Sequence, residues 1–429
     1  MNIVIALVHI GFIGFIAFRT WRTEPSLKLF FWPALLFKIA AGIALGLVYK
    51  YYYFVGDTFN FFEDGVKLAA YARNDSFGYL KFMWSGDESF SVWHQLFYQQ
   101  ERSVFFTKII SLFSLLTFDN YWMASVYFSV ISFFCSWHLV KVLIGFFPEA
   151  KIPALAAFLF FPSVVFWSSG IVKESVAAAS LFFLTAVFIK LWFHEKVGLA
   201  AGLATACAVW LLWNLKYYFA AIFLPVVFTS LVVRFLILPF LKPQKQVVEI
   251  LLWLICFAFF LFVASNLHPN FYADRFLRVM VENHDIFLQL STPENLIQFY
   301  HLSPDVLSVL MNAPWAVISG LFRPFIWESG NLFQFLIAAE NFIVLTLFIS
   351  SLSQVKLLFQ SRQRLLLLSM GVYALLLCVF LTLSTPNFGT LSRYRIGYLP
   401  YVVLLLMLKN PFLTGFSNFI ERSFRNLVR

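Results

Sequence analysis

Long apolar runs separated by short polar segments recur along nearly the whole chain. Eleven of these runs come close to the ~20 apolar residues that a helix needs to cross a hydrocarbon core of roughly 30 Å. They cover residues 1–18, 29–50, 121–145, 152–168, 174–193, 197–213, 217–238, 247–265, 331–352, 364–384 and 396–410. The pattern predicts an all-α, polytopic helical membrane protein of about eleven spans, forming a single transmembrane domain over residues 1–429.

Two longer regions separate some of these runs, and the first covers residues 54–120. From Phe59 onward its apolar residues recur at helical spacing, with polar residues on another face, which favours an amphipathic helix lying on the membrane surface. The stretch 103–118 is short and carries a polar stripe of Thr107, Ser111 and Ser114. We therefore expect it to be a second surface helix, capped by Ser103, rather than a span.

The second longer region covers residues 266–330. It contains an amphipathic stretch near 272–290 and an apolar run, 306–322, that is interrupted by Pro314 and Gly320. The pattern allows this run to be either re-entrant or interfacial.

Charges divide unevenly between alternate loops of this topology. With the N-terminus outside, the inner loops hold 17 basic and five acidic residues, which leaves 31 − 17 = 14 basic and 21 − 5 = 16 acidic residues elsewhere. Such an excess follows the positive-inside bias and places both longer regions on the outer side of the membrane. Lys38 lies within the second run, and we expect its side chain to snorkel toward the inner headgroups.

Composition narrows the classes of function. The chain is 61% hydrophobic and 12% charged, which excludes an ordinary water-soluble fold. Its four cysteines stand singly within apolar runs and its seven histidines lack metal-ligand spacing, so the sequence predicts neither a disulfide framework nor a cysteine-based metal site. Membrane orientation accounts for the net charge of +10, and we expect no nucleic-acid partner.

Three carboxylates follow the second apolar run, on the side that faces water: Asp57, Glu63 and Asp64. In a chain with so few charges they are the candidate catalytic residues. Asp57 also stands just before the first turn of the expected helix, where a carboxylate can accept hydrogen bonds from free backbone N–H groups. A helix cap is therefore an equal alternative for Asp57.

Other charged residues fall at the outer ends of spans, and these are the candidate substrate-binding residues: Lys173, Glu174, Lys216, Arg323, Arg393 and Arg395. A Lys or Arg at a span end is most often an interfacial anchor. Arg393 and Arg395, however, oppose the positive-inside bias, and guanidinium groups bind phosphate oxygens through paired hydrogen bonds. We expect these residues to share one outward cavity with Asp57 and to hold a lipid phosphate.

Three segments resemble pieces of the GT-C superfamily of membrane glycosyltransferases: GDTFNFF around Asp57, FPSVVFWSSGIVKES before and through Lys173, and LSRYRIGYLP around Arg393. The acidic motif after an early span, followed by surface helices, is similar to the first outer loop of that superfamily, whose members use polyprenyl-phosphate-linked sugars. The resemblance implies that Asp57 is the catalytic or metal-coordinating carboxylate. Two departures are an acidic loop after the second span instead of the first and the lack of an Asp-x-Asp motif, so a divalent metal cofactor is left open.

The expected function is transfer of a sugar from a polyprenyl-phosphate-linked donor, at the periplasmic face, to a glycan, lipid or protein acceptor. Asp57 would act as general base, and Glu63 or Asp64 would assist through orientation or a metal. The cations would stabilise the departing phosphate. The alternatives are a polysaccharide polymerase that joins lipid-linked repeat units, a lipid or solute transporter, and a non-catalytic membrane subunit.

Overall fold

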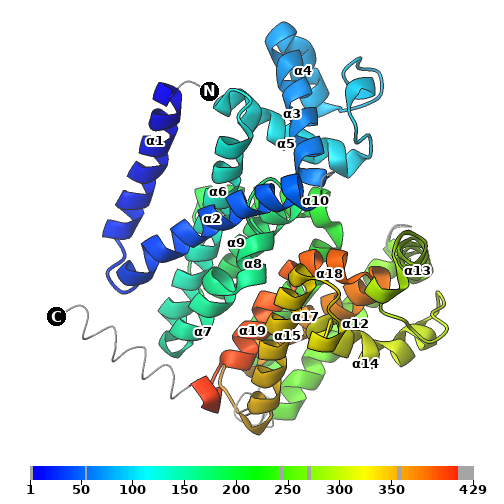
Figure 1. Cartoon of the computed structure of the whole chain (residues 1–429). Coiled ribbons are helices and arrows are strands. Elements are labelled where there is room, and N and C mark those ends of the chain that lie inside the picture. The colour runs from blue at the N-terminus through cyan, green and yellow to red at the C-terminus, as the bar shows by residue number, and fades with distance from the viewer. Residues whose placement is uncertain (1–2, 54–55, 242–245, 268–271, 355–359, 414–429) are drawn as a thin grey trace. The chain divides into compact units, whose positions relative to one another are not determined.

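The computed structural model describes residues 3–53, 56–241, 246–267, 272–354 and 360–413, and these residues fold almost entirely into helices (Figure 1). Across these ranges no strand forms, and one isolated bridge pairs Leu296 with Asn387. Eight helices in this part of the chain are long and apolar enough to cross a membrane. The prediction of a helical, multi-pass membrane protein is therefore confirmed.

The eight helices are α1 (Ile3–Arg22), α2 (Lys28–Tyr51), α6 (Tyr121–Phe146), α9 (Lys173–Trp192), α10 (Leu199–Val232) with its continuation to Leu241, α12 (Gln246–Leu267), α15 (Leu332–Ser351) and α17 (Arg364–Ser384). Several residues that define the charge bias lie outside the described ranges, namely Lys242, Lys245, Lys356, Glu421, Arg422, Arg425 and Arg429.

Four of the predicted runs are not single straight helices. Runs 197–213 and 217–238 both lie in α10, where the backbone of Lys216 leaves the helical region with φ −141° and ψ 66°. The run 152–168 divides into α7 (Lys151–Leu155), a π-helix (Ala156–Phe160) and α8 (Pro162–Trp167). This break follows from Pro162, which lacks an N–H donor and favours extended backbone at the preceding Phe161, with φ −69° and ψ 118°. The last run contains the short α19 (Leu399–Met407) after a 3₁₀ turn at Arg395–Gly397.

By its internal contacts the chain forms two compact units. The first comprises residues Met1–Val142, Phe158–Leu191 and Lys196–Tyr217, and the second comprises Leu143–Ala157, Trp192–Glu195 and Tyr218–Arg429.

In the first unit, α3 (Asp57–Asn74) packs lengthwise on α5 (Glu101–Thr117). The approach is close at Gly65, where an added Cβ would lie 2.5 Å from a methyl carbon of Ile110. The polar stripe of Thr107, Ser111 and Ser114 is buried on α5, with the Ser111 hydroxyl 3.0 Å from that of Tyr79 in α4 (Ser76–Trp84). Small and hydroxyl-bearing residues therefore form this helix contact, as in many membrane helix pairs.

The predicted cap at Ser103 is wrong. Helix α5 starts three residues earlier than such a cap implies, with Gln100 at the N-cap and no side-chain cap. Ser103 lies buried in the first turn, and its hydroxyl accepts a hydrogen bond from Lys173 Nζ at 2.9 Å. The Ser103 hydroxyl was predicted to accept a hydrogen bond from a backbone N–H of its own helix, and it instead contacts Lys173 of α9.

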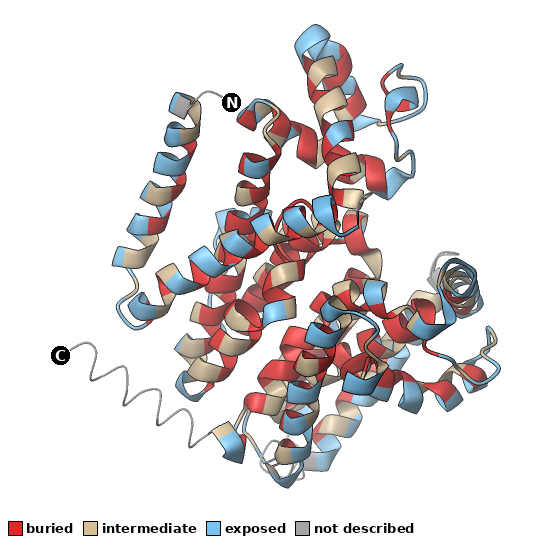
Figure 2. Cartoon of the chain, in the orientation of Figure 1, coloured by how far each residue is buried: buried red, intermediate tan, exposed pale blue. Residues whose placement is uncertain are grey.

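In the second unit, α14 (Val306–Phe322) packs against α15 and α17, and α13 (Ala273–Leu290) packs against α17. The short α18 (Phe388–Tyr394) and α19 also contact α17. Figure 2 shows how buried and exposed positions alternate along the helices. Many exposed residues are large and apolar, as expected for helices whose outer faces contact lipid.

One ion pair in the first unit fastens the end of α3 to the turn between α5 and α6. Arg73 donates to both carboxylate oxygens of Asp119 at 2.8 and 3.0 Å, and the Ser114 hydroxyl donates to one of them. Burial alone would raise the pKa of Asp119, but hydrogen bonds from Arg73 and Ser114 outweigh it and lower that pKa below its ordinary value.

We therefore expect Asp119→Asn to lower the thermal unfolding midpoint near neutral pH, by the equivalent of less than about 1 kcal/mol because the pair stays partly exposed. A carboxyl with a lowered folded-state pKa stabilises the fold above its unfolded pKa of about 3.9, and this contribution is lost as the pH falls through the folded-state value. The difference between wild type and variant should therefore shrink as the pH falls below about 4. Melting curves from tryptophan fluorescence in detergent measure it, with Glu63→Gln as control. A gap that stays constant from neutral to acidic pH would contradict the role of Asp119.

Candidate functional site

The three carboxylates of the acidic segment have different surroundings on α3. Asp57 is half-buried, Glu63 is exposed and Asp64 is fully buried. Positions 57 and 64 lie seven residues apart and so share a face of the helix, whereas Glu63 is on another face. The structure therefore brings two of the three predicted catalytic residues to one side of α3.

Asp64 connects α3 to the loop that precedes α5. One of its oxygens accepts from the backbone N–H of Phe97 at 2.9 Å and from Lys67 Nζ at 3.0 Å. The other oxygen accepts from the backbone N–H groups of Phe97 and Tyr98, at 3.0 and 3.1 Å. A buried carboxylate with this many donors is structural, so its contribution to a site is to hold the loop in place.

The loop held by Asp64 presents Tyr98 to Asp57. The Tyr98 hydroxyl donates to Asp57 Oδ1 at 2.8 Å, and its ring stacks on that of Phe61, with ring centroids 4.4 Å apart. Asp57 is the first residue of α3, and the N-cap position is taken by Gly56. The alternative of Asp57 standing before the first turn as a cap is therefore wrong, although a carboxylate in the first turn still interacts favourably with the helix dipole.

A lysine lies on the same aromatic ring. Lys173, the first residue of α9, places Nζ 4.8 Å from the centroid of Phe61 while donating to Ser103. Phe61 thus contacts both Tyr98, the partner of Asp57, and Lys173. Contacts within the first unit connect a half-buried carboxylate with a half-buried cation from a distant part of the sequence.

The first unit also contains a buried ion pair. Lys216 Nζ is 2.7 Å from Glu174 Oε1, and both side chains are almost completely buried. Their sequence neighbours Ile171 and Leu215 belong to one apolar cluster with Phe61. The break in α10 at Lys216 and the start of α9 therefore meet at the cluster that also carries the first turns of α3.

Lys38 does not snorkel toward headgroups as predicted. It is 1% exposed, and its Nζ donates to the Ser168 hydroxyl, which in turn donates to the carbonyl of Val164 in α8. The side chain reaches across to the break after α8 instead of along its own helix. The error arose because snorkelling is inferred from one helix, whereas the partner lies 130 residues away.

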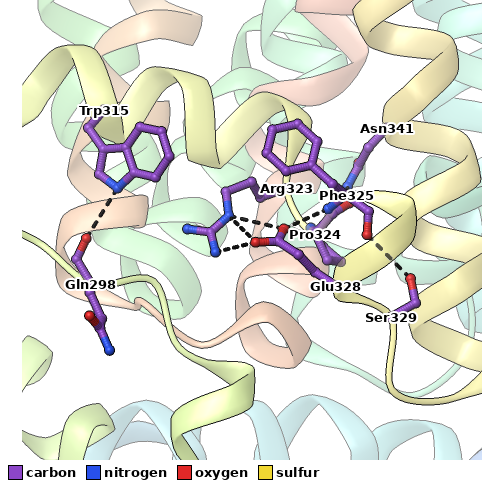
Figure 3. A network of polar contacts seen from close by, with 8 residues as sticks. All are labelled: Gln298, Trp315, Arg323, Pro324, Phe325, Glu328, Ser329 and Asn341. Carbon is purple, nitrogen blue, oxygen red and sulfur yellow. Dashed lines mark hydrogen bonds and ion pairs between the residues drawn. The ribbon is translucent and has the colours of Figure 1, made fainter.

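In the second unit, Arg323 and Glu328 form a close ion pair at the end of α14 (Figure 3). Arg323 Nε lies 3.0 and 3.1 Å from the two Glu328 oxygens, and Glu328 also accepts from the backbone N–H of Phe325 at 2.7 Å. The guanidinium lies against the rings of Trp315 and Phe388, 5.4 and 5.1 Å from their centroids. These contacts fix the arginine at the start of α18.

Arg395 lies at the same junction but is buried. Its Nη1 donates to Asn341 Oδ1 at 2.7 Å and its Nη2 donates to the carbonyl of Leu321 in the last turn of α14. Asn341 in turn donates to the carbonyl of Pro324 at 3.0 Å. A cation at a helix C-terminus satisfies free carbonyls and complements the dipole, which is a structural use of Arg395.

Arg393 is half-buried, with its guanidinium 5.6 Å from the ring of Tyr394. The described contacts therefore gather Arg323 and Arg395 around the end of α14, and Arg393 is at the adjoining end of α18. The predicted residues form two groups. Asp57, Glu63, Asp64, Lys173, Glu174 and Lys216 belong to the first unit, and Arg323, Arg393 and Arg395 belong to the second.

Two residues of the first group were not predicted as site residues. Neither Tyr98 nor Arg102, which is exposed on α5 with its guanidinium 4.0 Å from the ring of Tyr217, was singled out in the sequence. Their partners, Asp57 and Tyr217, are 41 and 115 residues away in the sequence. A local sequence pattern cannot predict pairs so far apart. Among the described residues, no group of three or more His, Cys, Asp or Glu side chains has the arrangement of a metal site.

Comparison of the chain with protein-family models, curated proteins and solved structures found no significant match. The chemistry of the two groups of residues is therefore the basis for a functional proposal.

The buried pair Glu174–Lys216 allows a stability test. Replacing one partner, as in Glu174→Leu or Lys216→Met, breaks a buried ion pair and should destabilise the fold by about 3 kcal/mol or more. The double variant Glu174→Leu/Lys216→Met removes both charges and should recover most of that loss. Urea or thermal unfolding in detergent measures the cycle. Single variants as stable as wild type would show that the pair does not form.

Proposed function

We propose that the chain is a membrane glycosyltransferase of the GT-C type with eleven spans. It would transfer a sugar from a polyprenyl-phosphate-linked donor to a glycan, lipid or protein acceptor at the periplasmic face of a bacterial inner membrane. The observation that carries the proposal is the half-buried Asp57, oriented by the Tyr98 hydroxyl and connected through Phe61 to the cation of Lys173.

The chemistry assigned to these residues is a displacement at the anomeric carbon of the donor. Asp57 takes the proton of the acceptor hydroxyl as the new carbon–oxygen bond forms. The bond from the anomeric carbon to the phosphate oxygen breaks, and the phosphate leaves with both bonding electrons. Lys173 stabilises that negative charge.

The remaining predicted residues have supporting roles in this proposal. Asp64 holds the loop that presents Tyr98, and the pair Glu174–Lys216 fixes the beginning of α9. Glu63 points from another face of α3 and is not assigned to the reaction. In the second unit, Arg323 and Arg393 are proposed to bind a phosphate group, and Arg395 supports them through the end of α14. A divalent metal is not required by this scheme.

A transporter is the second candidate, because two observations favour it. Lys38 is buried near the middle of α2, and the segment from α7 to α8 is a broken helix whose end contacts that lysine. Intramembrane charges and discontinuous helices are features of transport sites. A polymerase remains a variant of the first proposal, since it differs in the acceptor.

To test the proposed reaction, the full chain is reconstituted in liposomes and supplied with a panel of synthetic polyprenyl-phosphate monosaccharides. The polyprenyl phosphate that is released is measured. Asp57→Asn should reduce release by about 10²–10⁴-fold because the general base is lost. Tyr98→Phe should give a smaller loss together with an altered pH profile, since the hydroxyl acts through Asp57.

Glu63→Gln is the matched control, because it changes an exposed carboxylate on the same helix, and it should retain full activity. If Asp57→Asn inserts normally and releases polyprenyl phosphate at the wild-type rate, the assignment fails. If no donor is turned over but liposomes accumulate a lipid or solute in a manner that requires Lys38, the transporter is correct.

A further inference from the structure

Helix α14 carries its polar residues on the inside and its apolar residues on the outside. Ser308, Asn312, Ser319 and Gly320 are buried in the second unit. Asn312 is held there by hydrogen bonds with the backbone of Tyr300, at 2.9 and 3.0 Å. The opposite face consists of exposed apolar side chains: Val306, Leu307, Leu310, Met311, Trp315 and Ile318.

The neighbouring helix α13 has the reverse arrangement. Its buried residues are Leu277, Met280 and His284, which lie on the side that packs toward α17. Charged residues such as Arg275 and Glu282 are not buried. This is the pattern of a helix in contact with water. The outer face of α13 is therefore polar, whereas the outer face of α14 is apolar.

Exposure of the apolar face of α14 to water would be costly. Leu307 and Leu310 are 67% and 63% exposed, and leaving such large apolar side chains in water is unfavourable. A contiguous apolar face of this kind marks a membrane or protein contact. Residues 306–322 contain no charged side chain, and the helix is bounded by Asp305 at one end and Arg323 at the other.

The helices that pack against α14 indicate that its apolar face contacts the membrane rather than another protein. Both α15 and α17, on which it packs, are long enough to cross a membrane. Helix α15 has its own exposed apolar residues, including Leu336, Phe342 and Ile343. The outer face of α14 thus belongs to the same compact unit as the lipid-facing surface of a spanning helix.

We propose that α14 is embedded in the acyl-chain layer of the bilayer, with lipid chains against its face from Val306 to Ile318. At 1.5 Å per residue its length of 17 residues is about 25 Å, slightly less than the hydrocarbon core. It is therefore a membrane-embedded helix in addition to the eleven predicted spans, while α13 lies in water. The inference does not depend on the proposed sugar transfer.

The test compares nitroxide labels on the two helices in the full chain reconstituted in liposomes. Single cysteines replace Leu310 and Ile318 on α14, or Glu282 on α13, after the four native cysteines have been replaced by alanine. Labels at positions 310 and 318 should collide several-fold more with oxygen, which concentrates in lipid, than with a water-soluble nickel chelate. The label at position 282 should show the opposite preference.

Two results would overturn the inference. Access of the nickel chelate to position 310 equal to that at 282 would place α14 in water. Shielding of position 310 from both reagents would indicate a second copy of the chain on this face. If the cysteine-free chain does not fold, a benzophenone amino acid at position 310 of the otherwise unchanged chain should crosslink to lipid on irradiation. The same group at position 282 should not, and a crosslink to protein at 310 would again contradict the proposal.

Discussion

The carboxylate of Asp64 is buried in the contact between α3 and the loop before α5, where it accepts hydrogen bonds from Lys67 and from the backbone of Phe97 and Tyr98. A buried carboxylate is tolerated only when such donors surround it, so the loop cannot move away without leaving the charge unsatisfied. This constraint determines where Tyr98 lies. Through Tyr98 it determines the orientation of Asp57, and the arrangement of the candidate site in the first unit depends on it.

The same rule explains other buried polar groups. Lys38 donates to Ser168, Lys216 pairs with Glu174, and Arg395 donates to Asn341 and to a carbonyl of α14. Each contact joins elements far apart in sequence, and all three lie at a helix break or a helix end. In a chain with few charges and an apolar surround, such contacts specify which helices meet, because an apolar surface alone offers little discrimination between partners. The catalytic candidates are therefore positioned by polar contacts within a mainly apolar fold.

Periodicity and run length predicted the helical membrane architecture, the helix that begins near Asp57 and the helix at 103–118, because these features depend on local sequence. The errors concern contacts made at a distance. Ser103 was assigned to its own helix end and Lys38 to the headgroups, yet both bind residues from other helices. The interruption at Pro162 follows from local chemistry, and the kink at Lys216 lies between runs 197–213 and 217–238, which were predicted as separate helices. For the candidate site, the sequence predicted which carboxylates and cations to consider. It did not predict that Tyr98 is the hydrogen-bond partner of Asp57.

Amide hydrogen exchange of residues 93–100, followed by mass spectrometry in lipid nanodiscs, tests most directly whether Asp64 organises the site. In the wild type, the amides of Phe97 and Tyr98 should be protected by the buried carboxylate. Asp64→Ala should make this segment exchange much faster, while Glu63→Ala, which alters the exposed neighbour, should leave its exchange unchanged. Equal protection of the segment in all three proteins would contradict the account, because the loop would then be held without Asp64.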